Sequence, residues 1–208
     1  FMLGSASVQI LGPQEPYDNA NDTSIVLKVT YGQTSFLFTG DAGRTAEADI
    51  LNAGFDLSST VLKVGHHGSE SSTSYPFLRA IMPQYAVIQV GKGNSYGHPT
   101  EATLSRLRDA DVQVYRTDLQ GTVVCTSDGR TVSFSTEKNE DIQTNPTAPT
   151  TSVPANVSAS GEYIGNTNSK KYHLPSCKNL PAEKNRVQLH SREEALEKGY
   201  SPCGNCKP

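Results

Sequence analysis

The sequence predicts an α/β fold followed by a small α+β module stapled by zinc. Over residues 1–136, short β-branched and aromatic runs alternate with segments of helical spacing, a pattern typical of a mixed sheet with helices packed on it. A Thr/Pro-rich stretch at 137–160 has few apolar residues and predicts a disordered, solvated linker. Residues 161–208 are too few to bury a large core, so a metal staple is expected there.

Charge and hydrophobicity narrow the functional classes. Residues 161–208 carry eight Lys/Arg against five Asp/Glu, whereas residues 1–136 carry nine against thirteen, so only the C-terminal module has a charge that favours binding a polyanion. No run of about 18 apolar residues occurs, so no membrane-spanning helix is expected. No signal peptide is expected within this chain either.

The strands of the α/β domain follow from β-branched runs and turn signals. Gly32-Gln33 separates two such runs and predicts a hairpin. The expected strands are Ser7–Leu11, Ser24–Tyr31, Thr34–Thr39, Val61–Val64, Tyr85–Val90, Val112–Tyr115, Gly121–Thr126 and Thr131–Ser135.

Helices are expected between the later strands. The first covers residues 44–53, and the second begins after a cap at Ser72 or Ser74. The third covers residues 100–110, with His98 as its N-cap because a proline fits the first helical turn. In the C-terminal module, the expected elements are strands at Tyr163-Ile164 and Val187–Leu189 and a helix from Ser191 to Gly199.

Polar side chains follow the central strands where each strand stops. Asp41 comes after the second run of the hairpin, His66-His67 follow the next strand, and His98 closes the loop after the strand beyond. Because sites in open α/β sheets form at the carboxyl ends of strands, these groups predict a divalent metal site. Of two adjacent imidazoles, one can bind the metal while the other packs or hydrogen-bonds.

Each of these residues also has a simpler interpretation. Asp41 alone would be a turn former, and the histidine pair could belong to a surface turn. His98 could be a helix cap, a ligand, an acid or an anion binder.

These motifs resemble the second half of a metallo-β-lactamase-fold hydrolase of the ComEC type. The resemblance implies that Asp41 completes the site of a pair of divalent cations, Zn²⁺ or Mn²⁺, that one of His66 and His67 is a further ligand, and that hydroxide attacks a phosphate ester. Of the two histidines, we favour His66. His98 and Lys63 are then expected to assist catalysis at the phosphate or leaving group. The matching segments are Asn21–Leu27, Thr39-Gly40-Asp41, Val61–Ser69, Asn94–Pro99 and Tyr115–Asp118.

One motif of that family is absent from this sequence. Its first metal-binding loop, His-x-His/Asp-x-Asp-His, has no counterpart here. The domain is therefore expected to be the C-terminal half of an αββα fold, to need a missing N-terminal half as its partner, and to expose one face of its sheet. We expect the chain alone to bind catalytic metal weakly and to turn over slowly.

The spacing of histidine and cysteine in the tail predicts a closed tetrahedral zinc site. His173-x3-Cys177 and Cys203-x2-Cys206 supply one imidazole and three thiolates. Reduced core cysteines remain an alternative, whereas a disulfide between Cys203 and Cys206 would be strained and would leave Cys177 without a partner.

Tyr172–Cys177 and Gly199–Pro208 resemble the zinc-binding domain of the Ada DNA-repair proteins. That family uses four cysteines, one of which accepts a methyl group, and His173 replaces this cysteine. The resemblance therefore implies a zinc-stapled fold without methyl transfer. Basic residues near the site are expected either to contact a phosphate backbone or to form a solvated face: Lys170, Lys171, Lys184 and Arg186.

Together these features predict a metal-dependent phosphodiesterase or nuclease acting on DNA, with a zinc module that helps to hold DNA. One alternative is a hydrolase of a small phosphodiester or lactone. Another is a non-catalytic module that binds zinc and DNA. The Thr/Pro-rich linker favours an extracellular or cell-surface location, although a zinc-thiolate site also suits a reducing interior.

Overall fold

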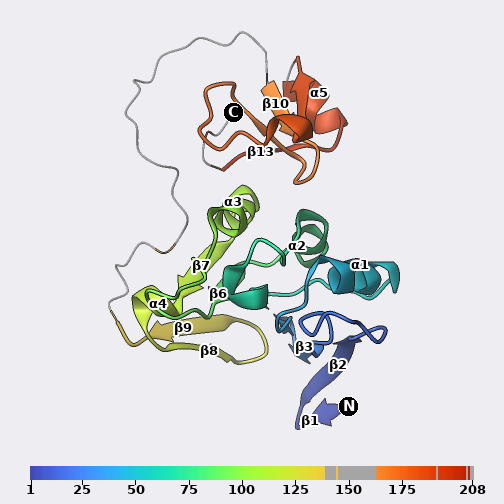
Figure 1. The fold of residues 1–208 in the computed structure, drawn as a ribbon, viewed down its shortest axis with the longest axis vertical. Helices are drawn as coiled ribbons and strands as arrows, with labels where there is room; N and C mark the ends of the chain where they lie inside the picture. Colours follow the sequence, from blue (N-terminus) through green and yellow to red (C-terminus); the bar gives the residue numbers. More distant parts are fainter. Residues whose placement is uncertain (139–143, 145–162, 191, 205, 207–208) are drawn as a thin grey trace. The chain divides into compact units, whose positions relative to one another are not determined.

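The computed structural model describes residues 1–138, 144, 163–190, 192–204 and 206 (Figure 1). It forms two compact units, Phe1–Asn145 and Pro146–Pro208. Most of the expected linker at 137–160 lies outside the described residues. Among the described helices, none has the length and apolar character that crossing a bilayer would require.

The first unit is built on a seven-stranded mixed sheet whose strands follow one another in chain order. The strands from β1 to β4 pair antiparallel, and those from β4 to β7 pair parallel. The carboxyl ends of the four parallel strands therefore meet at one edge. The strands are β1 (Met2–Leu3), β2 (Ala6–Gly12), β3 (Val26–Tyr31), β4 (Thr34–Phe38), β5 (Val61–Lys63), β6 (Tyr85–Ile88) and β7 (Gln113–Arg116).

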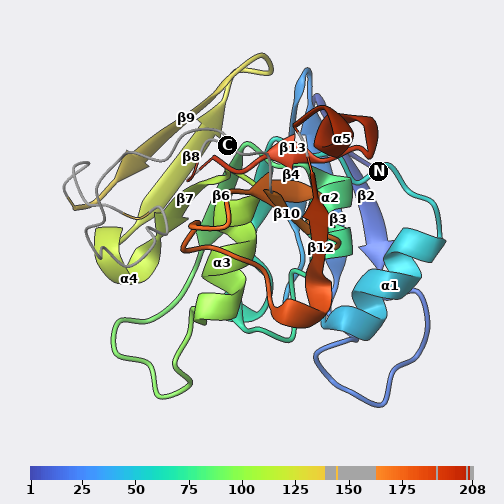
Figure 2. The same ribbon diagram turned by 90° about the horizontal axis from the view of Figure 1, so that it is seen from above.

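Three crossover helices cover one face of this sheet, side by side in Figure 2. They are α1 (Arg44–Asn52), α2 (Tyr75–Ile81) and α3 (Glu101–Asp109). Alternation along the strands turns Leu37, Leu62 and Ala86 toward them, where they are fully buried with Phe77 and Leu107. This apolar layer fixes the strand ends that carry the polar motifs.

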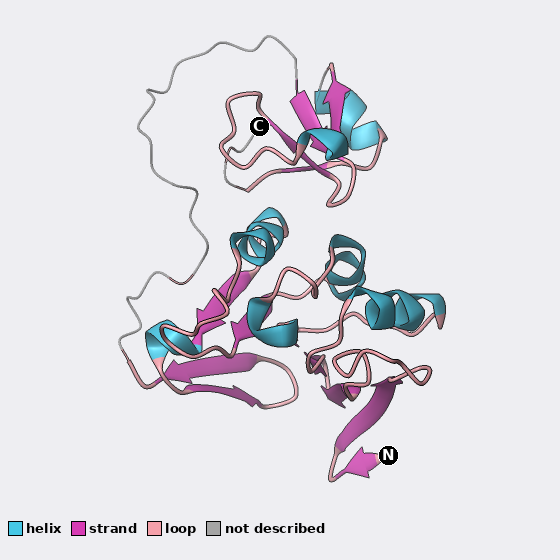
Figure 3. Ribbon diagram, viewed as in Figure 1, coloured by secondary structure: helices cyan, strands magenta, loops and turns pink. Residues whose placement is uncertain are grey.

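The opposite face is only partly covered. A short helix, α4 (Thr117–Gln120), leads to a hairpin of β8 (Val123–Ser127) and β9 (Val132–Thr136), which lies on the side of the sheet away from the helices (Figure 3). Phe134 of this hairpin stacks on Tyr115 at a centroid distance of 4.1 Å and contacts Tyr85 at 5.0 Å. Aromatic contacts therefore attach the hairpin to one end of the sheet.

The start of α3 differs from the expectation. Thr100, not His98, is the N-cap, and its hydroxyl accepts a hydrogen bond from the backbone N–H of Thr103 at 3.4 Å. The expected role of His98 as cap is wrong because the helix begins at Glu101, after Pro99 and the capping threonine. His98 is thereby left outside the helix.

The second unit contains a four-stranded sheet in the order β12-β10-β11-β13. Its small core consists of Tyr172, Leu189, Ala195 and Tyr200. The sequence did not indicate the strand at residues 171–173 or the two-residue strand at 201–202. The elements are β10 (Tyr163–Asn166), β11 (Lys171–His173), β12 (Arg186–Leu189), α5 (Arg192–Glu197) and β13 (Ser201–Pro202).

Candidate functional site

The polar motifs of the first unit converge where its parallel strands end. Asp41 follows β4, His66 and His67 follow β5, and His98 lies in the loop between β6 and α3. The ring centroids of His66 are 6.4 Å from those of His67 and 5.7 Å from those of His98. The Nε2 atom of His67 lies 3.8 Å from Oδ1 of Asp41. The structure thus gathers one carboxylate and three imidazoles.

The turn that carries Asp41 is held by the loop between β2 and β3. The hydroxyl of Ser24 accepts a hydrogen bond from the backbone N–H of Asp41 at 3.0 Å. The buried carboxylate of Asp22 accepts one from Gly43 at 2.7 Å. A side chain at Gly43 would lie 2.8 Å from the Asp22 carboxylate, so this close approach requires glycine.

His67 is oriented by a backbone carbonyl. Its Nδ1 lies 2.6 Å from the carbonyl oxygen of Gln89, which makes Nδ1 the donor, and its Nε2 faces Asp41. A ring nitrogen fixed in this way is typical of metal-binding histidines. The preference for His66 as the ligand stays a prediction, and the orientation of His67 makes it an equal candidate.

His98 is held by an asparagine in its own loop. Asn94 accepts a hydrogen bond from the backbone N–H of His98 at 3.0 Å and donates to its carbonyl at 2.6 Å. Tyr96 stacks on the ring at 5.9 Å. Burial lowers the pKa of His98, and the neighbouring histidines lower it further. The imidazole therefore favours its neutral form.

Gly68 joins the histidine pair to the loop of His98. Its φ of +87° and its distance from Pro99, where an added Cβ would lie 2.6 Å from the proline Cβ, both exclude a side chain. The carbonyl of Gly68 also accepts a hydrogen bond from the backbone N–H of Thr100 at 3.0 Å. The glycine of this motif therefore sets the distance between the two loops.

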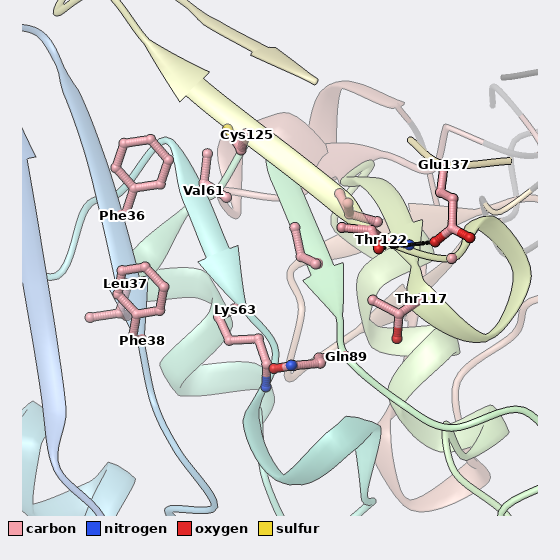
Figure 4. A pocket seen from close by; sticks show the side chains of 13 residues that line it. Phe36, Leu37, Phe38, Val61, Lys63, Gln89, Thr117, Thr122, Cys125 and Glu137 are labelled. Carbon is pink, nitrogen blue, oxygen red and sulfur yellow. Dashed lines mark hydrogen bonds between the residues drawn. The ribbon is translucent and has the colours of Figure 1, made fainter. Parts of the chain in front are cut away.

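Lys63 lies between this site and the open face of the sheet. Its Nζ donates to the carbonyl of Val64 at 2.8 Å. Burial lowers the pKa of Lys63, whereas the charge of Asp41 opposes that shift. A cavity of about 790 Å³ opens on this face between the sheet and the hairpin (Figure 4), lined by Phe36, Phe38, Lys63, Val87, Gln89 and Cys125 among others.

The tail contains a closed cluster of metal-binding side chains. The ligand atoms of His173, Cys177, Cys203 and Cys206 all lie within 4.8 Å of one another. Pairing of β11 with β13 places His173 beside Cys203, whose N–H donates to the carbonyl of Tyr172 at 2.9 Å. This set fits structural zinc. In the described part of the chain it is the one group of three or more such side chains whose ligand atoms lie this close together, so Asp41 and the three histidines near it form no comparably tight cluster.

The ionisable groups of the cluster shift one another's pKa values, and among the shifted groups only Cys203 moves toward the form that binds a cation. The Nδ1 atom of His173 lies 3.4 Å from Sγ of Cys177. Burial acts to lower the pKa of His173, but contacts with Cys177 and Cys203 outweigh it and raise the pKa to about 9. Hydrogen bonds from Cys177 and Cys206 lower the pKa of the Cys203 thiol. A thiolate is thus favoured where zinc would bind.

The four basic residues that were predicted to contact a phosphate backbone lie around one end of the sheet of this unit. Lys170 lies 4.7 Å from the centroid of the Tyr200 ring, and Lys171 donates to the carbonyl of Pro202 at 3.4 Å. Arg186 lies opposite Asn166 in the strand register, and Asn166 is followed by the turn that leads to these lysines. Lys184 lies in the short turn directly before Arg186. Their role in binding DNA stays a prediction.

Several supporting residues had no role in the sequence-based prediction. Asp22 and Ser24 belong to a motif that resembled the family, but nothing in their spacing indicated that they hold the Asp41 turn. Glu47 is an acidic residue on the apolar face of its helix. That position was the available sequence signal that its carboxylate is buried and has hydrogen-bond partners.

Comparison with known proteins identifies relatives of both units. The family described as the metal binding domain of Ada matches residues 155–208. ComE operon protein 3 of Bacillus subtilis is 36% identical over 127 residues, which cover 61% of this chain and 16% of that protein. Competence protein ComA of Neisseria gonorrhoeae is 44% identical over 102 residues, 49% of this chain and 15% of that protein. Recombination protein 2 of Haemophilus influenzae is 36% identical over 116 residues, which cover 55% of this chain and 14% of that protein.

The chain thus spans 16% or less of the length of these relatives. Within that span, the identities exceed what chance similarity of an α/β domain would give, and the Ada-type match falls on the His/Cys cluster. The chain is therefore related to the ComEC/ComA/Rec2 competence proteins and carries an Ada-type metal-binding domain.

Proposed function

We propose that this chain forms the second half of a metal-dependent hydrolase of the metallo-β-lactamase fold that cleaves DNA phosphodiesters. The observation that carries the proposal is the convergence of Asp41, His66, His67 and His98 at the carboxyl ends of parallel strands. The names of the relatives, which refer to competence and recombination, support DNA as the substrate.

Each residue has a distinct task in this proposal. Asp41 and a histidine of the adjacent pair hold the cations, Zn²⁺ or Mn²⁺, which would supply a hydroxide and stabilise charge on the phosphate. The amine of Lys63 adds positive charge beside Asp41, where a phosphate oxygen would approach. Because the pKa of His98 is lowered, its neutral imidazole would support the leaving group or a phosphate oxygen through a hydrogen bond rather than by giving up a proton.

The remaining ligands of the site come from a preceding half of the fold. Its sheet would cover the open face, where one row of paired residues runs across the strands: Ile10, Leu27, Phe38, Lys63, Val87 and Tyr115. Ile10 is 58% exposed and Phe38 is 42% exposed, which is unusual for apolar residues in the middle of a sheet. We therefore expect residues 1–208 alone to show little turnover.

Hydrolysis by the full-length protein tests this proposal. With Mn²⁺ or Zn²⁺ present, we expect it to degrade single-stranded DNA faster than phosphodiesters of choline or lactones. Asp41→Asn should lower the rate by more than about 100-fold, beyond the effect of outer metal partners. The matched control, Asp18→Asn in an exposed loop, should retain the rate. Faster turnover of a small ester or lactone would replace DNA as the substrate.

A non-catalytic role in binding DNA is the second candidate, and the basic end of the zinc unit favours it. We expect the 208-residue chain to shift the mobility of DNA, with loss of the shift after zinc chelation or after Lys184→Ala and Arg186→Ala together. A mobility shift that survives both changes would show that the tail does not bind DNA.

The Thr/Pro-rich segment supports a location outside the cell or at its surface, which protease treatment of intact cells would test.

A further inference from the structure

The loop that carries the two histidines has an unfavourable backbone. We define the histidine loop as residues 65–74. His66, His67 and Thr73 have φ values of +46°, +54° and +52°. Residues with a Cβ rarely adopt this left-handed region, and such backbone persists only where surrounding contacts hold it. The source of those contacts therefore decides where the imidazoles lie.

Glu47 of α1 holds the C-terminal end of the histidine loop. It is 2% exposed, and its two carboxylate oxygens accept hydrogen bonds from the backbone N–H groups of Thr73 and Ser74, the second at 2.9 Å. Ser74 occupies the N-cap position of α2, but its side chain makes no capping bond. A carboxylate from a neighbouring helix thus satisfies the N–H groups of the N-cap residue of α2 and of the residue before it.

Arg106 of α3 holds the same segment from the other side. Its Nη2 atom donates to the carbonyl oxygens of Ser72 at 2.9 Å and Glu70 at 3.3 Å, and the side chain is 6% exposed. Thr103, one turn earlier, donates from its hydroxyl to the carbonyl of Ser69 at 2.8 Å. Side chains of α3 therefore donate hydrogen bonds to the carbonyl groups of the loop, while the Glu47 carboxylate accepts hydrogen bonds from its N–H groups.

These contacts reach the histidines through two short hydrogen-bonded links. The hydroxyl of Ser72 donates to the carbonyl of Gly65 at 2.8 Å, and the hydroxyl of Thr73 accepts from the N–H of Gly65 at 3.2 Å. Gly65 directly precedes His66, and a Cβ there would lie 3.2 Å from both hydroxyl oxygens of Ser72 and Thr39. Movement at residues 72–73 therefore moves the start of the histidine pair.

We propose that Glu47 and Arg106 are positioning residues that hold the histidine loop in the strained conformation in which His67 faces Asp41 and His66 lies beside His98. The proposal rests on the proposed function only in that these rings would serve a cation. Neither residue touches the substrate site, so each acts through the loop.

Hydrogen exchange in the 208-residue chain tests the positioning directly. Glu47→Gln keeps the shape of the side chain but leaves one carboxamide oxygen to accept from two N–H groups. We expect the amides of Thr73 and Ser74 to exchange about 10- to 100-fold faster, the range for loss of a charge-assisted hydrogen bond, while the amides of α1 keep their rates. Glu101→Gln, an exposed acid on α3, is the matched control and should change neither set.

Arg106→Gln gives a second, independent variant. We expect it to speed exchange at the histidine loop and to broaden or double the ring signals of His66 and His67 without affecting those of His173 and His190. Exchange that rises equally through α1, α2 and α3 would indicate general destabilisation and overturn the proposal. Unchanged exchange at Thr73 and Ser74 in both variants would also overturn it.

Binding of Mn²⁺ by the full-length protein adds a separate measurement. Glu47→Gln should weaken it by about 10- to 100-fold, as for other residues that orient metal ligands. If the wild-type protein binds neither Mn²⁺ nor any Zn²⁺ beyond that of the tail cluster, the proposed hydrolase function fails, but the exchange result still decides whether Glu47 and Arg106 position the loop.

Discussion

The two units of the chain are stabilised in different ways. In the first, a continuous apolar layer between sheet and helices includes Leu37, Leu62, Phe77 and Ile88, so its stability is spread over many side chains. In the second, few residues are buried and the His/Cys cluster lies among them. We therefore expect the first unit to stay folded when a single buried contact is lost, whereas the second unit depends on its His/Cys cluster.

Removal of zinc should therefore have the largest effect and should affect one unit only. Structural zinc in small domains contributes about 10–16 kcal/mol of folding free energy. We expect Cys203→Ser, or chelation of the wild-type protein, to collapse the amide dispersion of the second unit in NMR spectra while that of the first unit persists.

Cys125→Ser is the control for that experiment. Cys125 lies on β8, in the first unit and outside the cluster, so its replacement should leave both sets of signals in place. Persistence of a folded second unit without metal would contradict the comparison.

Truncation of the apolar layer should give the converse result. Leu62 is fully buried in the central parallel strand, and Leu62→Ala should lower the free energy of unfolding of the first unit by about 2–5 kcal/mol in urea titrations. Val124→Ala, at a side chain that is 48% exposed, should change it by less than about 0.5 kcal/mol. Loss of the second unit in Leu62→Ala would show that the two are not independent.

The first unit also has one point of strong dependence, at Gly68. Gly68→Ala combines a positive φ with a clash against Pro99, whereas Gly54→Ala has a φ of +75° and no neighbour within 4 Å. We expect Gly54→Ala to lower the unfolding free energy by about 1–2 kcal/mol, the cost of the left-handed region alone. Gly68→Ala should lower the unfolding free energy by more than that and should alter the NMR signals of the His98 ring. Equal effects of the two substitutions would show that Pro99 can shift to make room for the added Cβ at little cost.

Much of the fold was predictable because its elements are locally encoded. The strand at Tyr85–Ile88 and the helix at Arg44–Asn52 follow from β-branched runs and helical spacing, and the placement of Asp41 and His67 follows from the rule that parallel strands end at one edge. The Ada-type spacing of Cys203 and Cys206 likewise indicated the cluster.

The remaining features depend on tertiary contacts that no local pattern records. Glu47 lies on an apolar helix face, but only the placement of the Thr73 and Ser74 N–H groups shows what its carboxylate binds, and two hydrogen-bonded carbonyls explain why Arg106 is buried. The cap of α3 was misplaced because Pro99 was assigned to the first helical turn, whereas it precedes the capping Thr100, whose N–H and hydroxyl donate to the carbonyl of Gly68. The short strand β13 pairs with β11 alone and had no signal of its own.

The smallest expected effect concerns an ion pair of the first unit between the buried Lys28 and the exposed Asp56. A hydrogen bond from Ser58 and the charge of Lys28, whose Nζ lies 3.1 Å from the carboxylate, lower the pKa of Asp56 from 3.8 to about 2. Because the pKa of the folded state is the lower one, this stabilisation is complete above pH 3.8 and is lost as the pH falls through about 2. The Asp56 side chain is 77% exposed, so Asp56→Asn should lower the unfolding free energy at pH 7 by less than about 1 kcal/mol.

Urea titrations should show that difference in unfolding free energy shrinking toward zero near pH 2. Ser58→Ala should shift the loss of this stabilisation to higher pH. A difference that stays constant with pH would mean that Asp56 acts through the shape of its turn rather than through its charge.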